Sequence, residues 1–172
     1  MTRKGLTLKE LTALFRKLGA PSPGAWAQSQ HTEDIDQLAR FAFLREAWKG
    51  VVAPDDVSWI DQTAASTKPG ADEPCGGVGP ALQRLLAAGA DPEDIHEVVR
   101  VMQYELLFSI CYLLEDPGQL EPEIADLAWR LMRTNEDGEV VGPIEGLHES
   151  VLELDPSGRE MRRRRTAGTP RD

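Results

Sequence analysis

Four polar residues interrupt an apolar stretch near the middle of the chain, and they are the first candidates for chemistry. His96, Arg100, Gln103 and Glu105 lie close together in the sequence. On a helix, residues three or four apart share a face, so His96, Arg100 and Gln103 would form one polar stripe. Histidine and carboxylate groups transfer protons and arginine binds anions, so this set could line a pocket that holds a tuned acid.

Glu105 belongs to a second stripe of the same expected helix, which it shares with Val101 and Phe108. A carboxylate on a buried apolar face is costly unless it is paired. We therefore expect an ion pair between Glu105 and an arginine of another helix, with Arg45, Arg84 and Arg130 as candidates. Such a pair would make the cluster structural, whereas an unpaired Glu105 would favour the pocket.

A second candidate is the glycine-rich stretch Cys75, Gly76 and Gly77, which precedes an expected helix start at Pro80. Backbone amides at a helix start can hold an anion, and a cysteine there can have a lowered pKa. No Lys-Ser/Thr pair follows, and no strand precedes the stretch. It is therefore neither a P-loop nor a dinucleotide-binding turn, and a flexible linker is the favoured interpretation.

Nothing in the sequence indicates a metal or a cofactor, and we predict none. His31, His96 and His148 lie on separate expected elements, and His148-Glu149 lacks the second histidine of a zinc-protease helix. The turn at 135–139 resembles the middle of a calcium loop, but its first and last ligand positions hold Arg133 and Ile144.

Helical spacing dominates the elements that would position these residues. Thr7 and Glu10 form a capping box before an apolar face at Leu8, Leu11 and Phe15. Residues 20–31, with two prolines, are expected to be a loop, and Val140-Val141 is too short for a convincing strand. The expected helices cover about 7–19, 32–50, 54–64, 80–89, 91–114, 122–133 and 143–154.

The expected helix at about 92–114 is apolar nearly all round from Val98 to Leu114. A helix of this kind is usually the buried centre of a bundle. The sequence therefore predicts an all-α fold, an irregular bundle of about six or seven helices packed around this central helix, with no significant sheet.

The domain organisation follows from composition. Residues 66–79 contain two prolines and four glycines, which predicts a flexible loop. Residues 159–172 are rich in arginine and are expected to be a disordered basic tail. The prediction is one helical domain over 1–158 followed by that tail.

Charge divides in the same way. The chain has a net charge of −10, and residues 159–172 hold six arginines and two acids, so +4 in the tail leaves −14 on residues 1–158. An acidic body repels nucleic acid and anionic membranes and attracts a basic protein partner. Only the run Arg162–Arg165 could contact nucleic acid.

Location is predicted from apolar content and cysteines. The longest apolar stretch, Leu106–Leu114, is too short to cross a bilayer, and no apolar leader follows the first residues. We expect no membrane contact, two free thiols and a cytoplasmic location. Fourteen arginines against five lysines suggest a bacterial genome.

Three functions remain after this survey. Without a catalytic set of residues, the first is a non-enzymatic acidic helical binding protein, such as a bacterial immunity-type inhibitor or a regulatory adaptor of a basic protein. The alternative is a small enzyme or ligand-binding domain with a cleft between the central helix and the 66–79 loop, using His96, Arg100 and Glu105. A structural role through self-association of Trp26 or Trp59 is a third.

Overall fold

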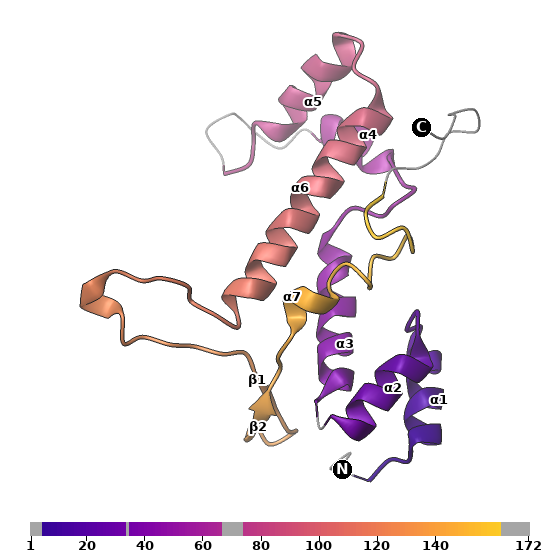
Figure 1. Cartoon of the computed structure of the whole chain (residues 1–172). Coiled ribbons are helices and arrows are strands. Elements are labelled where there is room, and N and C mark those ends of the chain that lie inside the picture. The colour runs from indigo at the N-terminus through magenta and orange to yellow at the C-terminus, as the bar shows by residue number, and fades with distance from the viewer. Residues whose placement is uncertain (1–4, 34, 67–73, 163–172) are drawn as a thin grey trace, which may run out of the picture. The chain divides into compact units, whose positions relative to one another are not determined.

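The computed structural model describes residues 5–33, 35–66 and 74–162. The protein is mostly helical, at 54%, which confirms the all-α prediction. The described residues form seven α-helices, two short 3-10 turns and one two-stranded sheet (Figure 1). The helices are α1 (Leu8–Leu18), α2 (Pro23–Thr32), α3 (Gln37–Ala47), α4 (Ser58–Ala64), α5 (Val78–Ala87), α6 (Pro92–Leu113) and α7 (Leu147–Ser150).

Contacts divide the chain into two compact units, which are described separately. Unit 1 contains the described residues of Met1–Trp48 and Leu107–Asp172, and unit 2 contains those of Lys49–Leu106. The division falls within α6, so each unit holds one part of that helix. A single domain over 1–158 stays a prediction.

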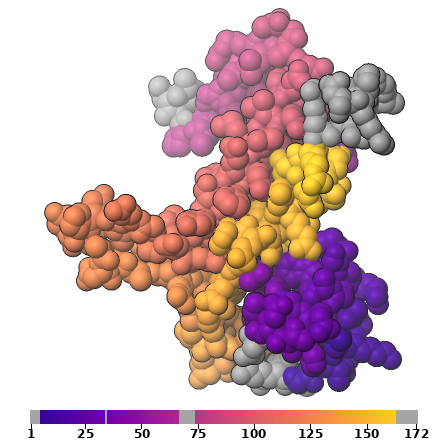
Figure 2. Space-filling model, viewed as in Figure 1, coloured from indigo at the N-terminus to yellow at the C-terminus, as the bar shows by residue number. Residues whose placement is uncertain are grey.

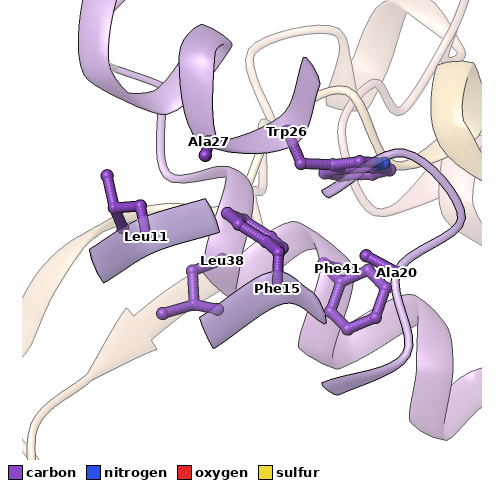
Figure 3. Packing of buried hydrophobic residues seen from close by; sticks show 7 residues of the cluster. All are labelled: Leu11, Phe15, Ala20, Trp26, Ala27, Leu38 and Phe41. Carbon is purple, nitrogen blue, oxygen red and sulfur yellow. The ribbon is translucent and has the colours of Figure 1, made fainter. Parts of the chain in front are cut away.

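An aromatic core holds together the first three helices of unit 1. The seven residues of this core come from α1 to α3 and the turn after α1, as Figure 3 shows: Leu11, Phe15, Ala20, Trp26, Ala27, Leu38 and Phe41. The ring of Phe15 lies 6.0 Å from that of Trp26 and 5.7 Å from that of Phe41. The Phe15 and Phe41 rings meet edge to face, at an interplanar angle of 81°, and a pair of this kind adds to the free energy of burial.

The capping box at the start of α1 is confirmed. The backbone N–H of Glu10 donates to the Thr7 hydroxyl, and the Glu10 carboxylate accepts from the Thr7 backbone N–H at 2.9 Å. Hydrogen bonds from the Thr7 hydroxyl and backbone lower the pKa of Glu10. The cap therefore favours the charged carboxylate beside the positive end of the helix dipole.

The prediction of a loop over 20–31 is wrong, because α2 occupies most of it. Pro23 lies at the first position of α2, where a missing N–H and a fixed φ are compatible with a helix. Trp26 and Ala27 of α2 are buried in the aromatic core. The following helix starts later than predicted, since the Asp36 carboxylate caps α3 by accepting from the Ala39 N–H.

The predicted helices at 122–133 and 143–154 are also wrong in extent. Residues Pro122–Ile124 form a single 3-10 turn, and β1 (Met132–Thr134) then pairs antiparallel with β2 (Val140–Pro143). Helix α7 has only four residues. Ile124 and Leu127 match helical spacing, yet both are exposed, and a short amphipathic helix depends on burying its apolar face.

Unit 2 is built from α4, α5 and the first part of α6. Its small core consists of Ile60, Ala64 and Leu82, with Val57, Trp59, Leu86 and Ile95 packed against it. Helices α4 and α5 contact each other directly. The described residues contain no helix that is long and apolar enough to span a membrane.

The prediction that the 92–114 helix is buried all round is wrong. Val98, Met102 and Leu106 are 58%, 63% and 61% exposed, and apolar side chains of α6 in unit 1 are exposed too. Figure 2 shows atoms of α6 at the visible surface. The buried side chains of α6 are His96, Arg100 and Cys111, two of which are polar.

Candidate functional site

The predicted polar stripe on α6 is brought together in unit 2. His96 and Arg100 are each only 3% exposed. The His96 Nδ1 accepts from the Trp59 indole N–H at 3.0 Å. Arg100 donates to the Val52 carbonyl, and the Gln103 side-chain oxygen accepts from the Val52 N–H at 2.8 Å.

These bonds determine what the stripe can do chemically. The stripe holds the 52–59 segment against α6 by satisfying both backbone groups of Val52. Buried polar groups are stable when they are hydrogen-bonded in this way. The geometry favours the interpretation of His96, Arg100 and Gln103 as structural contacts rather than as a pocket lining.

Glu105 is not part of this buried stripe. Its side chain is exposed. The expected burial of Glu105 is therefore wrong. Two of its three candidate partners are engaged elsewhere: Arg45 with Glu46 at 3.0 Å, and Arg130 with Glu145 at 3.1 Å. An exposed carboxylate has little need of a partner, since water solvates it.

The opposite face of α6 in unit 2 carries an apolar stripe. We call Val98, Met102 and Leu106 the outer stripe; they follow one another four residues apart and are each more than half exposed. Their spacing puts them on one face of the helix, roughly opposite His96 and Arg100. In this part of α6 the two buried side chains, His96 and Arg100, are polar, and the three side chains of the outer stripe are apolar and exposed, which is the inverse of an ordinary surface helix.

Carboxylates flank the outer stripe. Asp94 and Glu105 are exposed and lie next to Val98 and Met102, whereas Arg100, the one arginine of α6, is buried. The charges that this part of α6 presents to solvent are therefore all negative. Such a face attracts cationic groups, and the attraction falls as salt rises.

Unit 1 contains a cavity of about 470 Å³ that the sequence did not indicate. Its walls come from α3, the end of α6, α7 and the residues between α6 and α7. The lining residues are Arg40, Tyr112, Leu114, Glu115, Asp116, Arg130, Ile144, Glu145, Gly146, His148 and Glu149. The volume is in the range of small-ligand sites, and the lining carries charges of both signs.

Two charged side chains in this cavity are held firmly. Arg40, 7% exposed, donates from Nε to the Glu145 carbonyl at 2.5 Å and from Nη1 to the Ser150 hydroxyl at 3.3 Å. The Glu115 carboxylate accepts from the backbone N–H groups of Gly146 and Leu147. Both side chains therefore fix the start of α7 as well as lining the cavity.

His148 lies beside Glu115, with its Nδ1 3.4 Å from a carboxylate oxygen. The rings of Phe108 and Tyr112 meet the imidazole edge to face, at centroid distances of 6.2 and 5.1 Å. A carboxylate beside a histidine is the arrangement of many proton-transfer pairs. Here the Glu115 carboxylate also accepts hydrogen bonds from two backbone N–H groups at the start of α7. Its position is therefore explained as well by capping that helix as by proton transfer.

The two cysteines lie in different units, with Cys111 buried and Cys75 exposed. Cys75 and Cys111 are both free thiols, as predicted. Burial, followed by the charge of Glu115, raises the pKa of Cys111 to about 11, so this thiol stays protonated. Cys75 and Gly76 help to line a cavity of about 320 Å³ in unit 2, and Gly77 does not. Of the predicted loop, residues 67–73 lie outside the described residues.

The predicted site residues and the cavities do not coincide. Neither the cavity of unit 1 nor that of unit 2 is lined by His96, Arg100, Gln103 or Glu105. Arg40, Glu115 and His148 were missed because they come from three distant segments, and no sequence spacing links them. The outer stripe could have been found, because its four-residue spacing is visible in the sequence.

Arg162 is the one residue of the run Arg162–Arg165 that the structure describes, and it pairs with Glu160 at 2.5 Å. Residues 163–165 lie outside the described part of the chain. Within that part, no group of three or more His, Cys, Asp or Glu is placed to hold a metal. No protein-family model, no curated protein and no solved structure matches this chain.

Proposed function

We propose that this chain is a non-enzymatic, acidic protein-binding protein that engages a basic partner through the outer stripe of α6. The observation that carries the proposal is the inversion of this helix in unit 2. His96 and Arg100 are almost fully buried, whereas Val98, Met102 and Leu106 are mostly exposed. Single exposed apolar residues are ordinary, but three on successive turns form a continuous surface that favours contact with another molecule.

The energetics favour an interface that combines apolar and charged contacts. Covering the exposed part of each outer-stripe side chain contributes about 1 kcal/mol. Three such side chains alone are too few for stable association, given the entropy that binding costs. The flanking carboxylates therefore matter, because they steer a basic partner to the stripe and restrict which partners bind.

The charge of unit 2 supports a basic partner. Residues 49–106 contain ten acidic and four basic residues, a net charge of −6. A regulatory adaptor or an inhibitor of a basic protein, in the manner of bacterial immunity proteins, is the role that fits this surface. The free thiols Cys75 and Cys111 support action in the reducing cytoplasm.

Affinity capture tests this proposal. The tagged full chain retains a basic protein from extracts of its native cell at low salt, and Met102→Asp reduces the retained amount at least about tenfold, because a carboxylate then occupies the centre of the apolar stripe. High salt weakens capture by the wild-type chain. His148→Gln, in the cavity of unit 1, is the matched control and captures normally. Equal capture by the wild-type and Met102→Asp chains would contradict the proposal.

The cavity of unit 1 favours a second candidate function, the binding of a small polar ligand. Its volume of about 470 Å³ and the side chains Arg40, Glu115 and His148 on its walls support this candidate. Thermal unfolding with a panel of small polar ligands separates the two functions. A ligand that binds in this cavity raises the melting temperature of the wild-type and Met102→Asp chains but not of His148→Gln, and no shift with any of the ligands would count against this candidate.

A further inference from the structure

We infer that the partner segment is an amphipathic α-helix with lysines or arginines beside its apolar face, lying along the outer stripe of α6. This inference rests on the proposed function and names the chemistry of the partner. It follows from three properties of the stripe: its shape, the state of its backbone and the charges beside it.

The shape of the stripe fits a helix. Val98, Met102 and Leu106 form a ridge that rises along α6 for about 12 Å, at 1.5 Å per residue. A row of side chains spaced four residues apart packs into the groove between the corresponding rows of another helix. A partner helix with apolar residues on successive turns would therefore meet all three side chains at once.

The backbone of the stripe excludes the main alternative mode of peptide binding. An extended peptide adds to a protein by hydrogen-bonding to the free edge of a sheet. Val98, Met102 and Leu106 lie inside α6, where N–H and carbonyl groups are used by the helix itself. The stripe offers side chains alone, so the partner's own backbone groups must be satisfied internally, as they are in a helix.

The charges beside the stripe select a basic helix over a second copy of this chain. Asp94 lies four residues before Val98 and Glu105 lies three residues after Met102, so both exposed carboxylates are beside the stripe on α6. Two copies meeting through the same stripe would bring these carboxylates toward one another, and like charges at an interface are unfavourable. Lysines or arginines flanking a partner's apolar face would instead pair with them.

The same carboxylates disfavour a lipid surface. Membrane-surface helices combine an apolar face with lysines and arginines, which contact anionic headgroups. The outer stripe has carboxylates in those positions. A basic, amphipathic protein helix is therefore the partner that fits both the apolar side chains of the stripe and the carboxylates beside it.

Three synthetic peptides of about 18 residues test the inference with the full-length chain. The first has leucines on one helical face and lysines on the other. The second replaces each lysine by glutamate, and the third keeps the composition of the first but shuffles it so that the leucines share no face. Binding is followed by fluorescence anisotropy of labelled peptide at low and high salt.

We expect the first peptide to bind at least about tenfold more tightly than the other two, and high salt to weaken it. Met102→Asp and Leu106→Asp each weaken it at least about tenfold. Val140→Asp, at a residue of unit 1 that is 65% exposed, is the matched control and changes nothing. Far-UV circular dichroism confirms that each variant folds, as expected for substitutions at exposed positions.

Each of the other outcomes overturns the inference in a distinct way. If the glutamate peptide binds as tightly as the lysine peptide, the partner segment need not be basic. If the shuffled peptide binds as tightly as the lysine peptide, the partner segment need not be an amphipathic helix. A dimer in light scattering that Met102→Asp dissolves makes the occupant a second copy. Binding to phosphatidylcholine vesicles that Met102→Asp abolishes makes it a membrane. Suppose that Met102→Asp abolishes capture of a protein from cells, but the three peptides bind equally well. The proposed function then stands, and only the inference of a helical, basic partner segment is wrong.

Discussion

Replacing Phe15 by alanine lowers the free energy of unfolding of the aromatic core by about 3–5 kcal/mol, because a large ring leaves a cavity there. Phe15 is fully buried, and its ring contacts the rings of both Trp26 and Phe41. We expect a lower midpoint of urea unfolding for Phe15→Ala. The unfolding is monitored by far-UV circular dichroism at about 222 nm, where helix content is measured.

Arg16→Ala is the matched control for this substitution. Arg16 is the next residue of α1 and its side chain is exposed. Substitutions at exposed positions usually change stability by no more than about 0.5 kcal/mol. If Phe15→Ala and Arg16→Ala had similar midpoints, the aromatic core would not be what stabilises α1 to α3.

Replacing Gly146 by alanine lowers the stability of unit 1 by at least about 2 kcal/mol. Gly146 has a φ of +68°, and a Cβ built there would lie 2.0 Å from Nη2 of Arg40. Alanine must therefore adopt a left-handed conformation and also displace a buried guanidinium. That displacement breaks the hydrogen bonds of Arg40 to Glu145 and Ser150. Urea unfolding measures the loss.

Gly138→Ala separates the two causes. Gly138 has a φ of +81°, but a Cβ there would meet nothing within 4 Å. Its substitution carries only the conformational cost of about 1–2 kcal/mol. In an Arg40→Met background, which removes the guanidinium, the added cost of Gly146→Ala should fall toward that of Gly138→Ala. An unchanged added cost would show that Arg40 does not depend on the glycine.

The elements that the sequence predicted well have strong local signals. The capping box of Thr7 and Glu10 and the apolar spacing of Leu11 and Phe15 predicted α1 within a residue at each end. The acids after Pro92 predicted the start of α6. Local hydrogen bonds and helix-dipole contacts of this kind act within one turn, so a short stretch of sequence contains all the groups involved.

Elements that depend on tertiary contacts were predicted poorly. Ile124, Leu127 and Leu131 have helical spacing, but the chain turns at residues 125 and 126 and then forms no helix before β1 pairs with β2. In the other direction, Pro23 and Gly24 indicated a loop, and α2 forms because Trp26 packs on Phe15 and Phe41. Packing partners far along the chain override local propensity in both cases.

The candidate site shows the same limit at the level of side chains. Spacing placed His96, Arg100 and Gln103 on one face of α6, and the structure brings them together against Val52 and Trp59. Periodicity identifies residues that share a face but not which face is buried. Because the polar face of α6 is buried, Val98, Met102 and Leu106 are exposed. The prediction of a fully buried helix did not anticipate this exposed apolar face.

The measurement that tests the central claim most directly is photo-crosslinking in the native cell from a reactive amino acid placed at Met102. The inverted face of α6 predicts a crosslink from this position to a protein rich in lysine and arginine. Val140, which is 65% exposed in unit 1, provides the comparison position and should give no such product. A crosslink from position 140 without one from position 102, or none from either, would contradict the account.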